Sequence, residues 1–426
     1  MNRQDPRYAQ YIQILKDELI PATGCTEPIA LAYGAARARS VLGKIPDRVE
    51  IIVSGNIIKN VKSVVVPNTG GLKGIEAAVA AGIVAGDETK LLDVLGSVTQ
   101  EDKARIQTYL DATEMTVRPT EAGPIFDINL ILHAGEDYVR LRIADRHTNV
   151  VLLERNGKRL LEVPWSEQSQ DAATPEEDSL TVKAILDFAE TVDLADIQDV
   201  LENQLTTNMA IAKEGLTNDW GACVGKVIAS AFGNSIPEAC KAAAAAGSDA
   251  RMSGCEMPVV ICAGSGNQGI TASVPVAVYA ERMGYSHETL LRGLIVSDLL
   301  TLHQKSGIGR LSAYCGAICA GCAAGAAMAW MDGGGFRAVS HTLVNSLAIV
   351  SGIVCDGAKP SCAAKIATAV DAGIFGYEMY KREKQFLDGE GIVKKGVENT
   401  IANVGRLGRD GMRETDREIL SIMIGE

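Results

Sequence analysis

The spacing of apolar residues changes once along the chain, and this change limits the folds that the sequence can adopt. Between residues 115 and 163, short runs alternate between apolar and polar side chains, separated by turn signals such as Gly135-Glu136 and Asn156-Gly157. Such runs predict an antiparallel sheet. From Leu180 onward the apolar spacing is helical with Gly punctuation, apart from a candidate strand at residues 258–262. The sequence therefore predicts an α+β fold with a mixed amino-terminal part and an all-helical carboxy-terminal part.

Local patterns give the remaining elements of the amino-terminal part. Apolar spacing predicts a helix over residues 8–19, an Ala-rich helix ending near Leu42 and a third helix over 75–86. Strands are expected at 48–54, 63–66, 115–118, 126–133, 138–143, 150–154 and 160–163. Residues 166–179 are polar and acidic and are the best candidate linker. We therefore expect a mixed domain over 1–165 and a helical domain over 180–426.

Composition and charge narrow the partners of the protein. Hydrophobic residues make up 47% of the 426 residues but aromatic residues only 4%, so the core must be built from small side chains that let helices pack closely. A net charge of -12 argues against a nucleic-acid or anionic-membrane surface, which would need a basic face. A small-molecule partner is expected, and a homo-oligomer stays open.

The first residues and the cysteines of the chain bear on its cellular location. No apolar stretch follows Met1, and ten cysteines without a secretory signal indicate reduced thiols, so we expect a cytoplasmic protein. The 20 uncharged residues from Ser312 to Met331 have the length of a membrane span but are rich in Ala and Gly. This stretch predicts a buried helix.

Three cysteines carry the strongest chemical signal. Cys315, Cys355 and Cys362 lie in surroundings poor in charge and rich in Gly and Ala, where a bulky inorganic group can pack against backbone. Three thiolates can hold an iron-sulfur cluster and leave one iron free to bind substrate. Cys319 and Cys322 share a helical spacing with Cys315, but that spacing is equally suited to core packing. The other cysteines in the helical part are expected to act as small hydrophobic residues.

Four motifs in one order carry a resemblance to a known family. They are Gly24-Cys-Thr-Glu-Pro28, Ser265-Gly-Asn-Gln-Gly-Ile270, Arg310-Leu-Ser-Ala-Tyr-Cys315 and the run from Cys355 to Cys362. Together they resemble the oxygen-sensitive L-cysteine desulfidases, which are related to the α chain of iron-sulfur L-serine dehydratases. The likeness runs from the first helix to the segment Thr415-Asp-Arg-Glu-Ile419.

This resemblance implies a helical part similar to the dehydratase α chain and a [4Fe-4S] enzyme. Such an enzyme converts L-cysteine and water to pyruvate, ammonia and hydrogen sulfide. Carried over residue by residue, the cluster ligands become Cys315, Cys355 and Cys362. The chain departs from the dehydratase pattern at Gly357, where those proteins have Pro, and in a shorter gap to the last cysteine. Whether Cys319 or Cys322 replaces Cys315 stays open.

Elimination from an amino acid also requires a base for the weakly acidic Cα proton. Cys25 is the first candidate, because a thiol ahead of a helix start is expected to have a lowered pKa. It is alternatively a fourth, displaceable cluster ligand. Glu27 is the second candidate, with stabilisation of the helix N-terminus as its alternative role. His303, beside Gln304-Lys305, is a weaker candidate.

Substrate binding requires donors for a carboxylate and acceptors for an ammonium group. Ser265, Asn267 and Gln268 precede a helix and offer both, with free backbone amides beside them. Asn68 and Thr69 in the turn Pro67–Gly71 form a second polar group, as do Asn56, Lys59 and Asn60. Arg251 is expected to pair either with a substrate carboxylate or with Asp249.

Other readings of the same residues remain open at this point. L-serine as substrate would give pyruvate and ammonia without sulfide. A pyridoxal-phosphate lyase would use Lys359 or Lys365 as its Schiff-base lysine, although the expected βαβ pattern is missing. A non-catalytic redox sensor would use the same thiols for a cluster without turnover. A structural zinc ion at the three thiolates is the last alternative.

Overall fold

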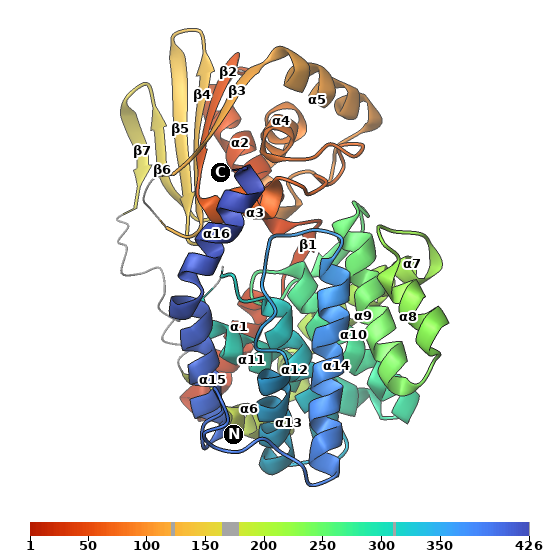
Figure 1. The fold of residues 1–426 in the computed structure, drawn as a ribbon. Helices are drawn as coiled ribbons and strands as arrows, with labels where there is room; N and C mark the ends of the chain where they lie inside the picture. Colours follow the sequence, from red (N-terminus) through yellow and green to blue (C-terminus); the bar gives the residue numbers. More distant parts are fainter. Residues whose placement is uncertain (121–123, 164–178, 310–311, 426) are drawn as a thin grey trace.

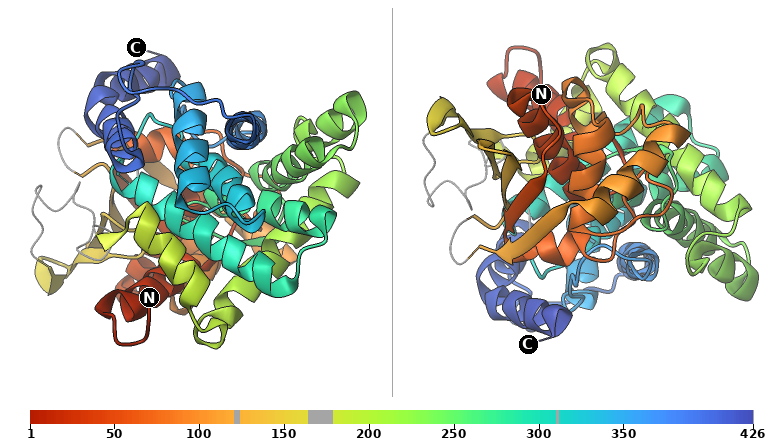
Figure 2. Two further views of the ribbon diagram at one scale, coloured as in Figure 1. Left: turned by 90° about the horizontal axis from the view of Figure 1, so that it is seen from below. Right: turned by 90° about the horizontal axis from the view of Figure 1, so that it is seen from above.

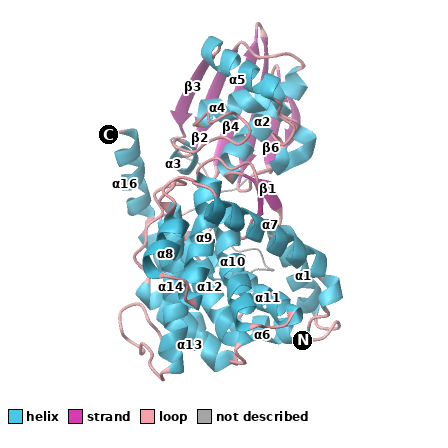
Figure 3. Ribbon diagram, turned by 90° about the vertical axis from the view of Figure 1, so that its right-hand side faces the viewer, coloured by secondary structure: helices cyan, strands magenta, loops and turns pink. Residues whose placement is uncertain are grey.

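The computed structural model describes residues 1–120, 124–163, 179–309 and 312–425, arranged as two lobes one above the other (Figure 1). Strands gather in the upper lobe and the lower lobe is helical (Figure 3). The predicted α+β organisation is therefore confirmed. The candidate linker at residues 166–179 lies outside the described residues except for Ser179.

The upper lobe is built on a sheet that has six strands within the described ranges, in the order β3-β2-β4-β5-β6-β7. The strands are β2 (Arg48–Val53), β3 (Glu114–Pro119), β4 (Asp127–Ala134), β5 (Asp137–Ala144), β6 (Val150–Arg155) and β7 (Lys158–Glu162). Neighbours run antiparallel except β2 and β3, which are parallel. The antiparallel pairing predicted over residues 115–163 is confirmed from β4 to β7, but β3 pairs in parallel with β2 instead. Helices connect β2 to β3 and return the chain to the same end of the sheet.

Helices lie against this sheet and against one another (Figure 1). They are α2 (Thr26–Leu42), α3 (Gly55–Val61), α4 (Ile75–Ala85) and α5 (Gln100–Ala112), with a short 3-10 helix η1 (Glu88–Asp93). Alternate residues Val49, Ile51 and Val53 of β2 are fully buried in this core. A Cβ placed on Gly82 of α4 would be 2.1 Å from the carbonyl oxygen of Ala32 in α2. Small residues thus let these backbones touch, as the composition predicts.

The strand predicted at residues 63–66 is wrong. The segment forms an isolated bridge between Val65 and Lys73. Between these residues the chain turns through positive φ at Asn68 (58°), Gly70 (76°) and Gly71 (100°). A tight turn of this kind ends the extended pairing after one bridge.

The lower lobe is a bundle of long helices. They are α6 (Val182–Thr191), α7 (Gln198–Thr217), α8 (Val224–Phe232), α9 (Ile236–Met252), α10 (Gly266–Met283), α11 (His287–Ser306), α12 (Gly316–Met331), α13 (Phe336–Ile349), α14 (Cys362–Lys381) and α15 (Val397–Arg406), with a 3-10 turn η4 (Leu194–Asp196). Helix α12 packs against α10, α11, α13 and α14 and is almost entirely buried. The uncharged stretch 312–331 therefore forms the buried helix that was predicted. Within the described ranges, no helix combines the length and apolar character needed to cross a membrane.

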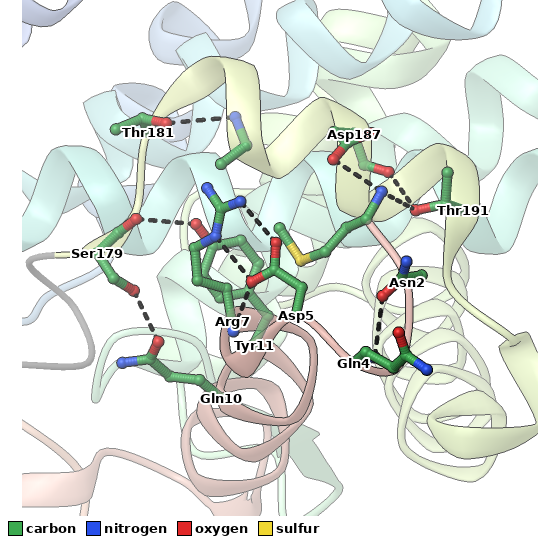
Figure 4. A network of polar contacts seen from close by, with 12 residues as sticks. Asn2, Gln4, Asp5, Arg7, Gln10, Tyr11, Ser179, Thr181, Asp187 and Thr191 are labelled. Carbon is green, nitrogen blue, oxygen red and sulfur yellow. Dashed lines mark hydrogen bonds and ion pairs between the residues drawn. The ribbon is translucent and has the colours of Figure 1, made fainter.

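The first helix belongs by its packing to the lower lobe. Helix α1 (Pro6–Glu18) buries Tyr11 against Phe188 of α6, with ring centroids 5.3 Å apart. The hydroxyl of Tyr11 donates to the carbonyl of Ser179 at 2.9 Å, and the amino terminus pairs with Asp187 at 2.7 Å (Figure 4). The division at residue 165 stays a prediction, but the packing core of the helical lobe includes these first residues.

Two crossings tie the lobes together. Strand β1 (Pro21–Thr23), which follows α1, pairs antiparallel with β8 (Pro258–Val260). Helix α15 packs on the lower lobe, and after a π-turn η5 (Leu407–Gly411) helix α16 (Arg413–Ile424) lies against α3 of the upper lobe. Both helices, in dark blue, lie at the periphery in the end-on views (Figure 2). We call α15, η5 and α16 the carboxy-terminal arm.

A buried polar cluster supports the segment after β8. The amide of Asn208 in α7 accepts from the Val260 N–H at 2.8 Å and donates to the Val260 carbonyl at 3.1 Å. Gln204 donates to the Asp298 carboxylate at 2.9 Å, and the Cys262 thiol also bonds to this carboxylate. Burial raises the pKa of Asp298 to about 7. Buried polar groups that have no access to solvent therefore form hydrogen bonds with the segment leading to α10 and fix its position.

Replacing Asp298 with Asn is expected to stabilise the protein above neutral pH. The folded pKa of about 7 exceeds the ordinary value of 3.8 for an aspartate, so the wild type loses stability as pH rises through that window. The Asn variant lacks this penalty, which is at most about 5 kcal/mol at about 1.4 kcal/mol per pKa unit. Chemical denaturation at pH 4 and pH 8 measures it. Equal stability differences at both pH values would contradict this prediction.

Candidate active site

A cleft lies between the two lobes and encloses about 960 Å³, including its opening to solvent. Its walls come from the Gly24–Pro28 loop, from α3, from the turn after β5 and from the start of α10. The segments around Cys315 and Cys355–Cys362 complete it. Eight of the ten predicted site residues line this cleft, and Asn68 and Thr69 do not. The eight are Cys25, Glu27, Ser265, Asn267, Gln268, Cys315, Cys355 and Cys362.

The amino-terminal ends of several helices point toward this cleft. Cys25 is the N-cap of α2, Ser265 the N-cap of α10 and Cys315 the N-cap of α12, while Cys362 is the first residue of α14. Each helix start presents free backbone N–H groups and a partial positive charge. The cleft is therefore suited to electron-rich groups such as thiolates and carboxylates.

Backbone pairing brings the segments that carry Cys315 and Cys355 together. Tyr314 and Val354 form an antiparallel bridge, the Cys355 N–H donates to the Ala313 carbonyl at 2.6 Å, and the Cys315 N–H donates to the Ile353 carbonyl at 3.3 Å. Cys362 follows a turn in which its own N–H donates to the Lys359 carbonyl at 2.9 Å. Three thiols that are distant in the sequence thus face one space.

The protonation of these thiols depends on what they bind. Burial, followed by the charge of the neighbouring Cys355, raises the pKa of Cys315 to about 12. Burial also raises the pKa of Cys362. At neutral pH, thiols with such pKa values lose their protons when they bind a metal, because the bound form of the ligand is the thiolate.

The spacing of these thiols bears on the kind of metal site. Within the described ranges, no group of three His, Cys, Asp or Glu side chains is close enough to hold one metal ion. Ligands of one ion must surround a single point, whereas the thiolates of a four-iron cluster bind separate irons. The donor set of three thiols around one cleft fits such a cluster.

The Gly24–Pro28 loop places a thiol beside a carboxylate. The Cys25 thiol donates to Glu27 Oε2 at 3.1 Å, and Thr26 Oγ1 donates to the same oxygen at 3.1 Å. Burial, followed by the charge of Glu27, raises the pKa of Cys25 well above its usual value. The lowered pKa expected from the helix start is therefore wrong, because burial outweighs the helix field. Gly24 has φ of 68° and no room for a side chain, since a Cβ would be 2.0 Å from Pro67 Cγ.

The start of α10 lies beside Arg251 of α9. One guanidinium nitrogen of Arg251 donates to the Gly24 carbonyl at 2.9 Å and another to Asn267 Oδ1 at 3.1 Å. The alternative pairing with Asp249 is not formed. Asp249 instead accepts the Gly225 N–H at 2.9 Å, and its pKa is raised to about 6 by burial.

Several other candidates lie away from the cleft. Asn68 donates to the Leu95 carbonyl at 2.9 Å and Thr69 to the Val66 carbonyl at 2.7 Å, so both side chains stabilise their own turn. His303 pairs with Glu398 at 2.6 Å on the carboxy-terminal arm. Cys319 and Cys322 are fully buried inside the helical core.

The two lysines considered for a Schiff base also form ion pairs of their own. Lys359 and Lys365 both form ion pairs with Asp356, and Lys365 donates to the Val354 carbonyl at 2.8 Å. Burial lowers the pKa of Lys365, but the bond to Asp356 outweighs this and raises it overall. A lysine held as an ammonium ion is a poor nucleophile.

The structure also brings to the cleft residues that the sequence did not single out. Asp145 and His147 reach it from the turn after β5, and Asp145 has φ of 67°, an uncommon conformation outside glycine. Tyr314 and Lys305 line it from the lower lobe. Asp and His in a short turn were the available signal, but only the packing of the two lobes places them here.

The helix α3 contributes the second-rank candidates. Asn56, Lys59 and Asn60 line the cleft. Asn56 donates to Asp416 of α16 at 2.9 Å, and the buried ammonium of Lys59 forms an ion pair with the same carboxylate. The carboxy-terminal arm therefore holds one wall of the cleft in place.

A family model described as serine dehydratase alpha chain matches residues 89–421. The chain belongs to this family. Its relatives include a UPF0597 protein of Desulfitobacterium hafniense, 55% identical over 426 residues that cover 100% of this chain and 99% of the relative. UPF0597 proteins of Finegoldia magna and Treponema denticola are 48% and 44% identical, and the matches cover 97% and 100% of this chain and 99% and 100% of those relatives.

Membership in the serine dehydratase alpha-chain family confirms the resemblance and supports a lyase. The family match over 89–421 contains the start of α10 and Cys315, Cys355 and Cys362, whereas the Gly24–Pro28 loop and α3 precede it. The cleft thus combines the family region with elements from the first 88 residues.

Gly357 is one of the two departures from the dehydratase pattern named above, and the structure gives a reason for it. Its φ is 93°, and a Cβ there would be 2.3 Å from the Lys59 carbonyl oxygen of α3. Proline requires a negative φ, so it does not fit this backbone. The loop between Cys355 and Cys362 is thus shaped to contact the upper lobe.

Replacing Gly357 with Ala is expected to lower the free energy of unfolding by about 1–3 kcal/mol and to reduce iron binding, because both backbone strain and the clash act on the cysteine loop. Thermal unfolding and iron content after anaerobic reconstitution measure these effects. Gly352→Ala is the matched control, since a Cβ there meets no atom within 4 Å. Equal behaviour of the two variants would contradict the assignment.

Proposed function

We propose that the protein is a [4Fe-4S]-dependent L-cysteine desulfidase. The observation that supports this most is the approach of Cys315, Cys355 and Cys362 to one cleft between the lobes. The cleft also holds a thiol–carboxylate pair and a buried guanidinium, which are the groups that an amino-acid elimination needs.

The donor set fits the cluster, and Cys315, Cys355 and Cys362 would hold it. Bound there, a cluster with one open iron supplies a Lewis acid for the carboxylate and the β-substituent of the substrate. The helix starts at Cys315 and Cys362 stabilise the thiolates that this binding requires.

Cys25 and Glu27 would manage the proton. The Cys25 thiol already donates to Glu27 at 3.1 Å, so the carboxylate can accept that proton and leave a thiolate. This thiolate would remove the Cα proton of the substrate or serve as the displaceable fourth ligand before substrate binds. Glu27 is the proton acceptor in both cases.

The net reaction is the elimination of sulfide from L-cysteine. The Cα–H and Cβ–S bonds break, the proton goes to the base, and the sulfur leaves with the electron pair as hydrosulfide, which takes up one proton to become hydrogen sulfide. The resulting 2-aminoacrylate tautomerises and hydrolyses with one water to pyruvate and ammonia. A soft thiolate leaving group suits a soft metal centre better than the hydroxyl of L-serine does.

Anaerobic reconstitution with iron and sulfide should give a brown protein that releases sulfide, pyruvate and ammonia from L-cysteine. Cys355→Ala should lose both iron and turnover, since it removes one of three anchoring thiolates. Cys223→Ser is the matched control, because Cys223 is the N-cap of α8 and does not line the cleft.

The same experiment separates the alternatives. Faster release of pyruvate from L-serine than from L-cysteine would favour a serine dehydratase. A stable cluster without turnover of either amino acid would favour a redox sensor. Zinc without inorganic sulfide in anaerobically prepared protein would favour a structural zinc site.

Replacing Glu27 with Gln should lower kcat for L-cysteine by about 100-fold or more while the iron content stays unchanged, because an amide cannot accept the Cys25 proton. Steady-state sulfide release and iron analysis measure this. Glu256→Gln is the control, since Glu256 pairs with Lys103 at 3.3 Å at an exposed position. A Glu27→Gln variant with wild-type kcat would remove Glu27 from the proposed proton path.

A further inference from the structure

Arg251 is a buried cation whose polar partners are neutral. The residue is 5% exposed, and its two terminal nitrogens donate to the Gly24 carbonyl and to Asn267 Oδ1. Its Nε has no hydrogen-bond partner, and among the described residues Arg251 forms no ion pair. A buried charge without a counter-ion is costly, so the cleft is built to receive an anion at this point.

The first turn of α10 points to the same anion. A Cβ on Gly266 would be 2.4 Å from Arg251 Nε, so the guanidinium occupies the volume that a side chain at position 266 would fill. Ser265, the N-cap of this 18-residue helix, makes no side-chain capping hydrogen bond. Free backbone amides and the unpartnered Nε therefore lie side by side, which is a typical arrangement for binding a carboxylate.

Gln268 supplies a second polar group without a hydrogen-bond partner, and this group is an acceptor, whereas Arg251 Nε is a donor. The residue is 6% exposed, and its amide oxygen has no hydrogen-bond partner. A Cβ on Gly316 would be 2.7 Å from this oxygen, so the amide lies directly against the residue that follows Cys315. A buried acceptor is thus placed between the anion position and the cluster thiols.

We propose that Arg251 and the first amides of α10 bind the substrate α-carboxylate, and that the Gln268 amide oxygen accepts a hydrogen bond from the α-ammonium group. This inference rests on the proposed function and adds the recognition of the substrate. With both ends held, the β-substituent is directed toward the side of the cleft formed by Cys315, Cys355 and Cys362. The site is therefore selective for α-amino acids that carry both groups.

Two ligands that each lack one group test the two halves separately. The compound 3-mercaptopropanoate keeps the carboxylate without the ammonium, and cysteamine keeps the ammonium without the carboxylate. Binding of each, and of L-cysteine, to the anaerobic reconstituted protein is measured by calorimetry for the wild type, Arg251→Gln and Gln268→Met. Arg282→Gln is the control, because Arg282 at the other end of α10 bonds to Asn234 at 2.7 Å.

Arg251→Gln should weaken L-cysteine and 3-mercaptopropanoate by about 10- to 100-fold and leave cysteamine unchanged, as expected for the loss of a charged hydrogen-bonding partner. Gln268→Met should weaken L-cysteine and cysteamine by about tenfold and leave 3-mercaptopropanoate unchanged. Arg282→Gln should bind all three ligands as the wild type does. Wild-type binding of 3-mercaptopropanoate by Arg251→Gln, or equal losses for all three ligands, would overturn the assignment.

The experiments distinguish a failure of the desulfidase proposal from a failure of the substrate-recognition proposal. If L-cysteine yields no sulfide but carboxylates bind in an Arg251-dependent way, the recognition site stands and the desulfidase does not. If sulfide is released and binding does not depend on Arg251, the recognition site is refuted. Arg251→Lys, which keeps the charge without the planar fork, should weaken carboxylate ligands less than Arg251→Gln does, and circular dichroism confirms that each variant is folded.

Discussion

The backbones of α12 and α14 touch, and the position of the cluster thiols depends on this contact. A Cβ on Gly321 would be 2.4 Å from the Ala369 backbone, and one on Gly325 would be 2.3 Å from the Gly373 backbone. The matched order of these pairs makes the helices parallel, so their amino-terminal ends lie together. Cys315 and Cys362 stand at these two ends. Larger side chains would separate the helices and with them the thiols.

The same small residues create a cleft whose charges are satisfied by what it binds. Helix starts, a buried guanidinium and thiols with raised pKa values all lie at one surface. Each of these features is unfavourable or incomplete without a ligand. A ligand that satisfies these groups would therefore add its binding free energy to the stability of the fold.

Much of the fold and of the cleft could be predicted from the sequence. The features that were missed all depend on contacts between residues that are far apart in the sequence. Alternating residues located β4, β5 and β6, and the uncharged stretch before Met331 located α12. The parallel pairing of β2 and β3 was missed because it depends on how the intervening helices return the chain. Asp145, His147 and the partner of Lys59 were missed because they reach the cleft across long sequence separations. The pKa of Cys25 was misjudged because its burial depends on contacts that local sequence does not contain.

The carboxy-terminal arm has a consequence for the assembly of the cleft. Asp416 of α16 holds Lys59 and Asn56 of α3 in the cleft wall. Lys59 and Asp416 are 357 positions apart in the sequence, so their ion pair closes a very long loop and must offset the entropy of that closure. The wall of the cleft is therefore complete only when the upper lobe, the lower lobe and the arm have packed together.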